Sequence, residues 1–401
     1  MSSDRLARID PVMEAFAESG GFAGLSVVLA RRGQTVFSGQ YGFRDREAGL
    51  PMTGDTIFRI YSMTKPVVST ALMMLFEEGR FRLTDPVAKY LPAFGAVKVL
   101  QEDGSLVEPL RPMQVRDLLT HTSGLTYDFL QDFAVADRYR EARLMNDPTR
   151  TLGQVITDLA ALPLAFQPGS RWHYSVGIDV AAHLIEVIAD EPLGAFLQRR
   201  MFGPLGMVDT AFGVPADQLG RLSAMYGLPD LFARNQTFGA LFEAWSGGYN
   251  QRADVSDTYP TDAPDTFVRG GIGLYATIGD YLRFGQMLAA GGQLDGTRLL
   301  GRKTLAFMHS NHLPADLLPY TVGGVPNPGW GFGLGSRVMM DPAATGAPGS
   351  VGEFGWAGAA KTYYWVDPVE DLVGVLMTQY MVAFDQPEMD LRALTYQAII
   401  D

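Results

Sequence analysis

Residues 56–79 read TIFRIYSMTKPVVSTALMMLFEEG, and this stretch decides how the rest of the chain is interpreted. Its first six residues are rich in β-branched and aromatic side chains, which predicts a short strand over 56–61. Pro66 suits the first turn of a helix, and the apolar run after it predicts a helix that reaches Gly79. Ser62 and Lys65 therefore fall where a strand passes into a helix.

Ser62 and Lys65 are candidates for a nucleophile and its base. A serine three residues before a lysine at a helix start shares one helix face with it, and the free N–H groups there add partial positive charge. A desolvated lysine in that place loses its proton more readily and can activate the serine. A chance S-x-x-K match is uncommon here because the chain has few lysines, at positions 65, 89, 98, 303 and 361.

The sequence WHYS at 172–175 supplies a candidate for proton transfer. It follows Pro168-Gly169, which marks a loop, and a helix is expected from Ile178. If the Tyr174 phenol lies near a cation its pKa falls, and as a phenolate it could take the Ser62 proton and later give it to a leaving group. The alternative is a packed aromatic side chain, which is the commoner fate of a tyrosine.

The sequence GWAGA at 355–359 lies on a predicted strand near the end of the chain. Small residues let an acyl carbon lie against the strand while a backbone N–H points at its oxygen. That N–H would supply half of an oxyanion hole, and the N–H of Ser62 would supply the other half. The alternative is a close-packed glycine strand without a catalytic role.

Composition excludes several classes of protein. The 401 residues carry a formal charge of −12 and no cysteine, so thiol catalysis, disulfides and thiolate metal sites are absent, and an acidic surface does not favour nucleic acid. The N-terminus lacks the apolar core of a signal peptide, and the longest apolar run, 67–76, is short for a membrane span. We expect a cytoplasmic protein that binds neither nucleic acid nor membrane; its oligomeric state has no sequence signal.

The histidines and glycines do not form the motifs of other enzyme classes. No H-E-x-x-H zinc pattern and no G-x-S-x-G nucleophile elbow occurs, and neither a P-loop nor a dinucleotide-binding pattern is present. We therefore expect no metal and no cofactor. The histidines are assigned surface or loop roles: His121, His173, His183, His309 and His312.

The order of predicted elements places strands at both ends of the chain and helices between them. A hairpin is predicted over 24–41 with its turn at 32–34, and two late strands over 355–366 and 372–379 are separated by Asp367-Pro368. Terminal strands of this kind can pair into one antiparallel sheet. Helices are predicted over 5–17, 115–120, 152–159, 178–189, 278–289 and 387–400, and residues 226–267 are aromatic with little periodicity. The expected domains are an α/β domain from 1–80 and 266–401, and an inserted, mainly helical domain over 81–265.

These motifs, in this order, resemble the serine β-lactamase and penicillin-binding-protein superfamily. There S-x-x-K supplies nucleophile and base, a middle loop supplies a Tyr or Ser, and a late strand carries K-T-G. The resemblance covers nearly the whole chain and includes LLTHTSGL at 118–125 and PLGM at 204–207. Within the superfamily the chain is most similar to the family VIII carboxylesterases. The resemblance implies an α+β fold of the β-lactamase/transpeptidase type, with an antiparallel sheet flanked by helices.

The resemblance also implies roles for individual residues. Ser62 would be the acylated nucleophile, Lys65 its general base, and Tyr174 the tyrosine of Y-x-N. The N–H groups of Ser62 and Ala359 would form the oxyanion hole. The remaining residues expected to contact substrate are Tyr61, Val176, Trp356, Ala357 and Gly358.

Two positions depart from the β-lactamase pattern. Val176 replaces the asparagine of Y-x-N, and Trp356 replaces the lysine of K-T-G, which removes the cation that would meet a β-lactam carboxylate. Lys361-Thr362 does not restore the motif, because Tyr363 follows where glycine is needed. Both losses favour an uncharged ester substrate.

The predicted activity is therefore that of a serine carboxylesterase acting on small or short-chain acyl esters through a Ser62 acyl-enzyme. Three alternatives stay open: an acyltransferase to an alcohol acceptor, a weak β-lactamase, and a non-catalytic relative that serves binding or assembly. Acyl length and stereopreference have no signal in the sequence.

Overall fold

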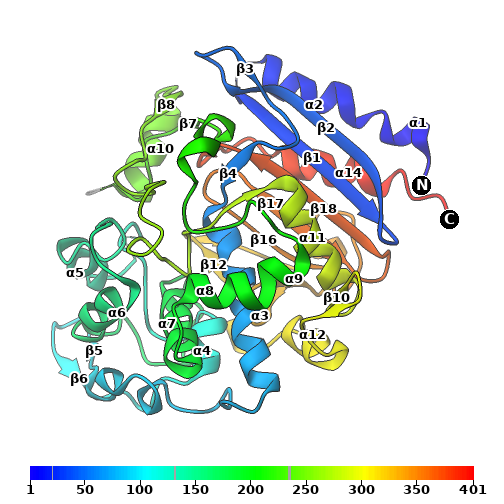
Figure 1. Ribbon diagram of the computed structural model, residues 1–401. Helices are drawn as coiled ribbons and strands as arrows, with labels where there is room; N and C mark the ends of the chain where they lie inside the picture. The colour runs from blue at the N-terminus through cyan, green and yellow to red at the C-terminus, as the bar shows by residue number, and fades with distance from the viewer. Residues whose placement is uncertain (20, 131, 234–235) are drawn as a thin grey trace.

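A large antiparallel sheet is built from strands at the two ends of the chain. The computed structural model describes residues 1–19, 21–130, 132–233 and 236–401. The sheet runs in the order β14-β15-β16-β17-β18-β1-β2-β3 (Figure 1). Its strands are β1 Gly24–Arg31, β2 Gln34–Asp45, β3 Leu50–Pro51, β14 Trp330–Phe332, β15 Arg337–Met339, β16 Phe354–Ala357, β17 Tyr363–Asp367 and β18 Leu372–Thr378. At its centre β1 pairs with β18, from Leu25 opposite Thr378 to Arg31 opposite Leu372. The predicted sheet from both ends of the chain is confirmed.

The hairpin of β1 and β2 turns at Arg32 and Gly33. Their φ angles are 52° and 74°, and two positive φ values in a two-residue loop match the right-handed twist of the flanking strands. The predicted hairpin is therefore confirmed, with β2 starting at Gln34, one residue earlier than expected.

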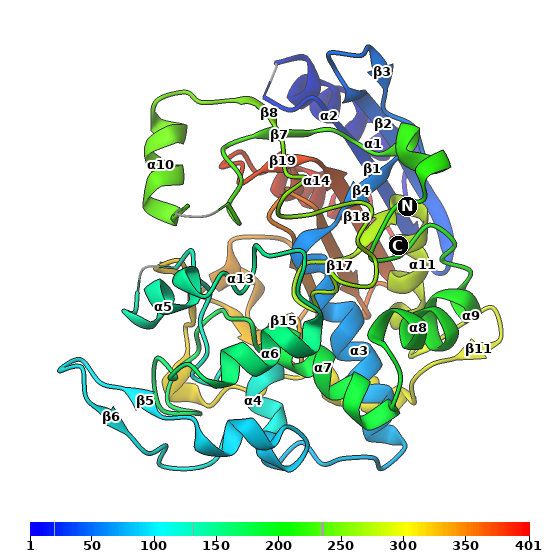
Figure 2. The same cartoon turned by 60° about the vertical axis from the view of Figure 1, so that its left-hand side comes forward.

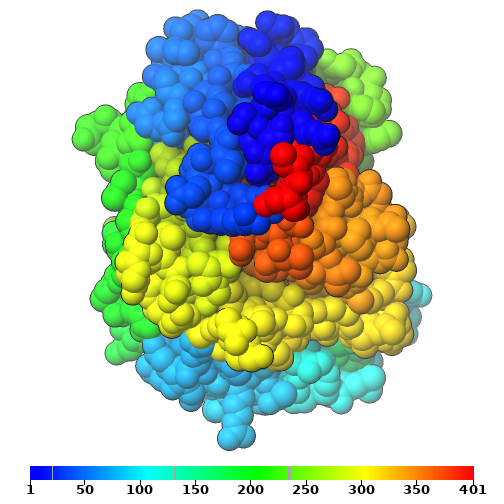
Figure 3. All heavy atoms as spheres, turned by 90° about the vertical axis from the view of Figure 1, so that its right-hand side faces the viewer, coloured from blue at the N-terminus to red at the C-terminus, as the bar shows by residue number. Residues whose placement is uncertain are grey.

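Helices from the two ends of the chain cover one face of this sheet. They are α1 Ser3–Leu6, α2 Ile9–Glu18 and α14 Pro387–Tyr396, and Figure 3 shows the first and last segments side by side on one face of the molecule. The single helix predicted over 5–17 is thus two helices. The apolar cluster beneath them contains Leu6, Ile9, Met13, Leu25, Val27, Leu29, Trp365 and Leu391, all buried.

The opposite face carries α3 Thr64–Glu77 and α11 Ile278–Ala289. α11 has the bounds predicted from sequence, whereas α3 begins two residues before Pro66, after a 3₁₀ turn over Tyr61–Met63. The strand before it, β4 Ile57–Arg59, pairs with β9 Tyr275–Thr277 rather than with the large sheet. α3 is buried along nearly its whole length because the sheet lies on one side and the helices α4 Val115–Leu119 and α7 Gly177–Ala189 lie on the other (Figure 2).

The strand predicted over 355–366 is two strands. β16 ends at Ala357 and β17 begins at Tyr363, and the chain turns between them. The Gly358 N–H donates to the Thr362 carbonyl at 2.8 Å, and Lys361 adopts a φ of 60°. Gly358 and Ala359 therefore belong to a tight turn beyond the strand rather than to the strand itself.

Residues 81–265 contain helices joined by long loops, and they also contain strands. β7 Met225–Gly227 pairs with β8 Gln251–Ala253 and with β19 Tyr380–Met381 from the end of the chain. This pairing joins the two predicted domains at one edge, so their boundaries stay a prediction. The other elements are α5 Val135–Glu141, α6 Leu152–Ala160, α8 Leu193–Leu197, α9 Gly203–Leu205, α10 Phe238–Ser246, α12 Arg302–Met308, α13 Pro342–Thr345, β5 Val99–Leu100, β6 Leu106–Val107, β10 Gln293–Leu294, β11 Thr297–Arg298, β12 Thr321–Val322 and β13 Val325–Pro326.

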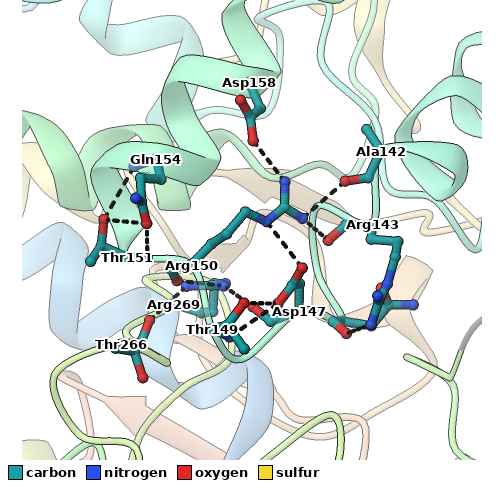
Figure 4. Close-up of polar contacts among 11 residues, drawn as sticks. Ala142, Arg143, Asp147, Thr149, Arg150, Thr151, Gln154, Asp158, Thr266 and Arg269 are labelled. Atoms are coloured by element: carbon teal, nitrogen blue, oxygen red, sulfur yellow. Dashed lines mark hydrogen bonds and ion pairs between the residues drawn. The ribbon is translucent and has the colours of Figure 1, made fainter.

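A buried arginine ties the loop before β9 to the helical segment. The Arg269 guanidinium donates to the carbonyl oxygens of Asp147 and Arg150, at 3.0 and 3.2 Å, and Arg150 in turn bonds Asp158 of α6 at 2.7 Å (Figure 4). Charge-assisted hydrogen bonds to main-chain oxygens are stronger than neutral ones. The network therefore fixes the loop that carries Gly271, whose carbonyl oxygen reaches the site described below.

Candidate active site

The turn before Ser62 is held in an uncommon backbone conformation. Tyr61 has a φ of 44°, a region that costs a non-glycine residue of the order of 1–3 kcal/mol unless its surroundings enforce it. The Tyr61 ring is fully buried, 5.6 Å from the Phe232 ring and 4.8 Å from the Tyr259 ring. This packing enforces the turn, so that the chain leaves β4 and enters α3 with Ser62 at the junction.

Ser62, Lys65 and Tyr174 form one hydrogen-bonded group. The Tyr174 hydroxyl donates to Ser62 Oγ at 2.7 Å, although the two residues are 112 positions apart. Lys65 Nζ lies 3.0 Å from the same Oγ and donates to the Gly271 carbonyl oxygen at 2.8 Å. The structure therefore brings together the three residues that the sequence predicted as catalytic.

Burial changes the proton affinity of Lys65. It lowers the pKa of Lys65 to about 7, and the Asp179 carboxylate opposes this shift. The amine is therefore neutral in a large fraction of molecules near neutral pH. Since Tyr174 donates to Ser62 Oγ, the Ser62 hydrogen is free to point at the lone pair of the neutral Lys65 amine.

Tyr174 differs from its sequence-based expectation. Burial raises the pKa of its phenol above the usual range, while the hydrogen bonds with Ser62 and Trp356 oppose the shift in part. Lys65 Nζ lies 4.6 Å from the ring centroid, but burial decides the direction of the shift. Tyr174 is thus a protonated donor in the resting site, and the predicted phenolate is not its resting form.

The turn after β16 packs directly against the segment that precedes Ser62. A Cβ on Gly358 would lie 2.4 Å from the Ile60 carbonyl oxygen and 2.2 Å from Thr362 Oγ1, so only glycine allows this approach. Ala359 and Ser62 both line the same cavity. In the described ranges the N–H groups of Ser62 and Ala359 donate to no protein acceptor. Their role as an oxyanion hole stays a prediction.

Ser62 and Tyr174 line a cavity of about 390 Å³, whereas Lys65 is fully buried and does not. Trp356, Ala357 and Gly358 line it as predicted, whereas Tyr61 and Val176 are buried and do not. Leu231, Phe232 and Phe238, from the aromatic segment 226–267, form part of its wall. The complete lining is Ser62, Tyr127, Phe129, Leu130, Tyr174, Leu231, Phe232, Phe238, Tyr320, Val322, Asn327, Arg337, Trp356, Ala357, Gly358, Ala359, Lys361, Thr362, Tyr363, Val382, Ala383 and Glu388.

Comparison with known proteins identifies the family. The family model described as Beta-lactamase matches residues 9–397. The chain belongs to the β-lactamase family. The predicted fold class and the predicted resemblance are both confirmed.

Several members of the β-lactamase family are similar over nearly their whole length. Protein Rv1367c of Mycobacterium tuberculosis is 35% identical over 90% of this chain and 87% of its own length. Esterase EstB of Burkholderia gladioli is 32% identical over 93% of this chain and 90% of its own. Among solved structures, EstCE1, titled a hydrolase with promiscuous acyltransferase activity, has a TM-score of 0.79 at 27% identity and covers 98% of this chain and 99% of its own.

Two buried residues of this β-lactamase-family site were not singled out from the sequence. Asp179, in the first turn of α7, accepts a hydrogen bond from the Gly271 N–H at 3.0 Å, and Tyr127 places its ring 5.2 Å from Lys65 Nζ. An aspartate in the buried first turn of a largely apolar helix was a signal for the first. Tyr127 had no distinguishing pattern, because its position depends on how the 121–130 loop folds.

The remaining features of the described chain add no second reactive centre. Across the residues that the structure describes, no group of three or more His, Cys, Asp or Glu side chains could hold a metal ion, and no helix is both long and apolar enough to cross a membrane. A larger hollow of about 790 Å³, bordered by α8 and Phe212, contains none of the predicted site residues. His121 lies in the turn after α4, which agrees with the expected loop position, but it is buried rather than on the surface, with its ring 4.9 Å from that of Tyr174.

Proposed function

We propose that the protein is a serine carboxylesterase that hydrolyses small or short-chain acyl esters through an acyl-enzyme on Ser62. The observation that carries the proposal is the group of Ser62, Lys65 and Tyr174, joined at 3.0 and 2.7 Å and open to a largely apolar cavity. Esterase EstB, a relative over nearly the full length, supports the same reaction class.

Acylation begins with the neutral Lys65 amine. It takes the Ser62 proton as Oγ bonds to the ester carbonyl carbon, and the N–H groups of Ser62 and Ala359 stabilise the oxyanion. The intermediate then collapses, and the departing alkoxide takes the proton of Tyr174. This step leaves an acyl-enzyme, a free alcohol, a Lys65 ammonium and a Tyr174 phenolate. The ammonium and the phenolate are close enough to stabilise each other.

Deacylation restores both groups. The Tyr174 phenolate takes a proton from water as the water oxygen bonds to the acyl carbon. Collapse of this second intermediate releases the carboxylic acid, and Ser62 Oγ takes the proton back from Lys65. General acid–base catalysis contributes roughly 10²–10⁴-fold and a single oxyanion donor roughly 10²–10³-fold.

A p-nitrophenyl acetate assay on matched variants tests this proposal. Ser62→Ala is expected to reduce hydrolysis to the uncatalysed rate, and Tyr174→Phe to lower kcat by roughly 10²–10⁴-fold because the leaving group loses its proton donor. Ser310→Ala is the control, since its exposed hydroxyl only bonds the Ala306 carbonyl oxygen. Undiminished hydrolysis by Ser62→Ala would overturn the mechanism.

Acyl transfer to an alcohol is the second candidate function. The same acyl-enzyme can be attacked by an alcohol in place of water, and EstCE1 is described as having such an activity. Adding excess short-chain alcohol to the ester assay separates the two: a transesterified product at the expense of free acid identifies a transferase, and unchanged acid release identifies a hydrolase.

β-Lactam hydrolysis is expected to be weak. Val176 and Trp356 remove the two polar groups that the β-lactamase pattern would use on a lactam, so a chromogenic cephalosporin should turn over far more slowly than a p-nitrophenyl ester. Labelling of Ser62 by a fluorophosphonate distinguishes all these enzymes from a non-catalytic relative, which would remain unlabelled.

A further inference from the structure

One end of the cavity is charged. Arg337, Lys361 and Glu388 all line it, beside the apolar wall described above. Lys361 Nζ forms an ion pair with Glu388 Oε1 at 2.8 Å, so these two charges balance each other. Arg337 forms no ion pair with any carboxylate in the described ranges, which leaves this end of the cavity with one uncompensated positive charge.

The Arg337 guanidinium is held rigidly. It extends from β15 opposite Gly355 of β16, stacks 4.2 Å from the centroid of the Trp330 ring and donates through Nη2 to the Tyr363 hydroxyl. Its Nε is buried and has no hydrogen-bond partner. A cation between two aromatic rings is fixed in orientation, and its hydrogen-bonding capacity is only partly used.

Glu353, a carboxylate whose charge Arg337 influences, is already engaged. Glu353 lies close enough for Arg337 to influence its charge, but it accepts hydrogen bonds from Arg392 at 2.5 and 3.0 Å and from Tyr396 at 2.7 Å. A partly desolvated guanidinium without an anionic partner is costly, and an anion that binds it in a fork removes that cost.

We propose that Arg337 binds a carboxylate of the substrate, so that the preferred substrates are esters with a free carboxylate remote from the scissile bond. The proposal rests on the esterase function above and narrows its substrate class. Trp356 removes the lysine of K-T-G, and Arg337 supplies a cation from the neighbouring strand instead. The uncharged ester expected from sequence is therefore replaced by one that carries an anion at its far end.

Glu388 defines where that carboxylate can bind. Its Oε2 is buried and has no hydrogen-bond partner, so a second carboxylate placed beside it would be repelled unless Lys361 screened both. The substrate anion is thus placed at Arg337 and Tyr363 rather than beside Glu388.

Matched ester pairs test the proposal. On the acyl side, mono-p-nitrophenyl adipate is compared with p-nitrophenyl hexanoate, and on the alcohol side, 4-acetoxybenzoate with its methyl ester. The rate measured with Ser62→Ala is subtracted from each rate as the background. The wild type is expected to favour the carboxylate in at least one pair, and the pair that shows the preference identifies which part of the substrate meets Arg337.

Arg337→Met should lower kcat/KM for the favoured carboxylate ester by roughly 10- to 100-fold, the range for one charge-assisted contact. The same substitution should change kcat/KM for the neutral ester of the pair by less than about threefold. Arg337→Lys should lose less kcat/KM for the carboxylate ester than Arg337→Met does. Arg32→Met, at an exposed ion pair, is the control. An equal loss for both members of a pair, or a wild-type preference for the neutral ester in both pairs, would overturn the proposal. If the wild type hydrolysed neither member of either pair faster than Ser62→Ala, the esterase function itself would be refuted instead.

Discussion

Lys65 connects burial to reactivity at the scale of single residues. Its amine has no carboxylate within ion-pair distance among the described residues, and its closest polar contacts are Ser62 Oγ and the Gly271 carbonyl oxygen. Water is excluded around it, so the neutral amine is favoured. Burying a charged lysine in a core is destabilising. Here burial lowers the pKa of Lys65, so its neutral amine can act as a base near neutral pH.

The pH profile of kcat/KM should show this directly. The active form needs a neutral Lys65, whose pKa is lowered to about 7, so activity should be complete above that pH and fall tenfold per pH unit below it. A stopped assay with p-nitrophenyl acetate from pH 5 to 9 measures the midpoint. A flat profile through pH 7 would contradict Lys65 as the base.

Asp179→Asn should move this midpoint to lower pH. The Asp179 carboxylate raises the pKa of Lys65 against the effect of burial, and asparagine keeps an oxygen for the Gly271 N–H while removing the charge. The variant should therefore retain activity at pH values where the wild type has lost it. Asp295→Asn, at an exposed ion pair with Arg283, should leave the midpoint unchanged; a shift to higher pH in Asp179→Asn would contradict this role of the Asp179 charge.

At the scale of elements, the contact between two turns assembles the site. The turn after β16 meets the turn between β4 and α3, and Gly358 is the point of contact with Ile60. The distance between the nucleophile and the proposed second oxyanion donor is set here, by the packing of main chain against main chain.

Gly358→Ala tests that contact. Its Cβ would lie 2.4 Å from the Ile60 carbonyl oxygen, so the turn must move away, at a cost of roughly 1–3 kcal/mol in unfolding free energy. The kcat of the folded variant should also fall, by more than the loss of folded protein explains, because Ala359 moves with the turn. Thermal unfolding and kcat measure the two effects. Gly54→Ala is the control, since no atom lies within 4 Å of its Cβ, and equal behaviour of the two variants would contradict this role.

The sequence predicted some elements better than others, for physical reasons. The bounds of α11 followed from its apolar spacing and Thr277, which caps its first turn. The strand predicted over 355–366 was wrong, because the break at 358–362 depends on Gly358 contacting Ile60, which is remote in sequence. β7 and β8 were missed because each is three residues long and because β7 gains part of its pairing from β19, which is remote in sequence.

At the scale of the whole molecule, the site is assembled from residues that lie far apart in the chain. The sequence motifs located Ser62, Lys65 and Tyr174, because each lies in a short recognisable pattern. They did not locate Arg337 or Asp179, because their relation to the cavity depends on strand order and helix packing across the chain. The helices near the two termini pack on the outer face of the sheet.

A buried ion pair joins the last helix to the sheet, and its loss should be costly. Arg392 of α14 and Glu353 beside β16 are both fully buried and lie 2.5 Å apart. Glu353→Gln leaves the Arg392 charge without its partner, so the free energy of unfolding should fall by about 3–5 kcal/mol. Guanidinium unfolding measures it. Glu191→Gln, which breaks a surface pair with Arg199, should lower the free energy of unfolding far less, because water screens an exposed pair; similar losses in both variants would contradict the assignment.

The central claim is that Ser62 becomes covalently acylated, and peptide mapping by mass spectrometry tests it most directly. The wild-type protein is treated with a fluorophosphonate or quenched during turnover of a short-chain ester. We predict one adduct, on the peptide that contains Ser62, and none on Ser62→Ala. An adduct on another residue, or none on a protein that hydrolyses the ester, would contradict the account.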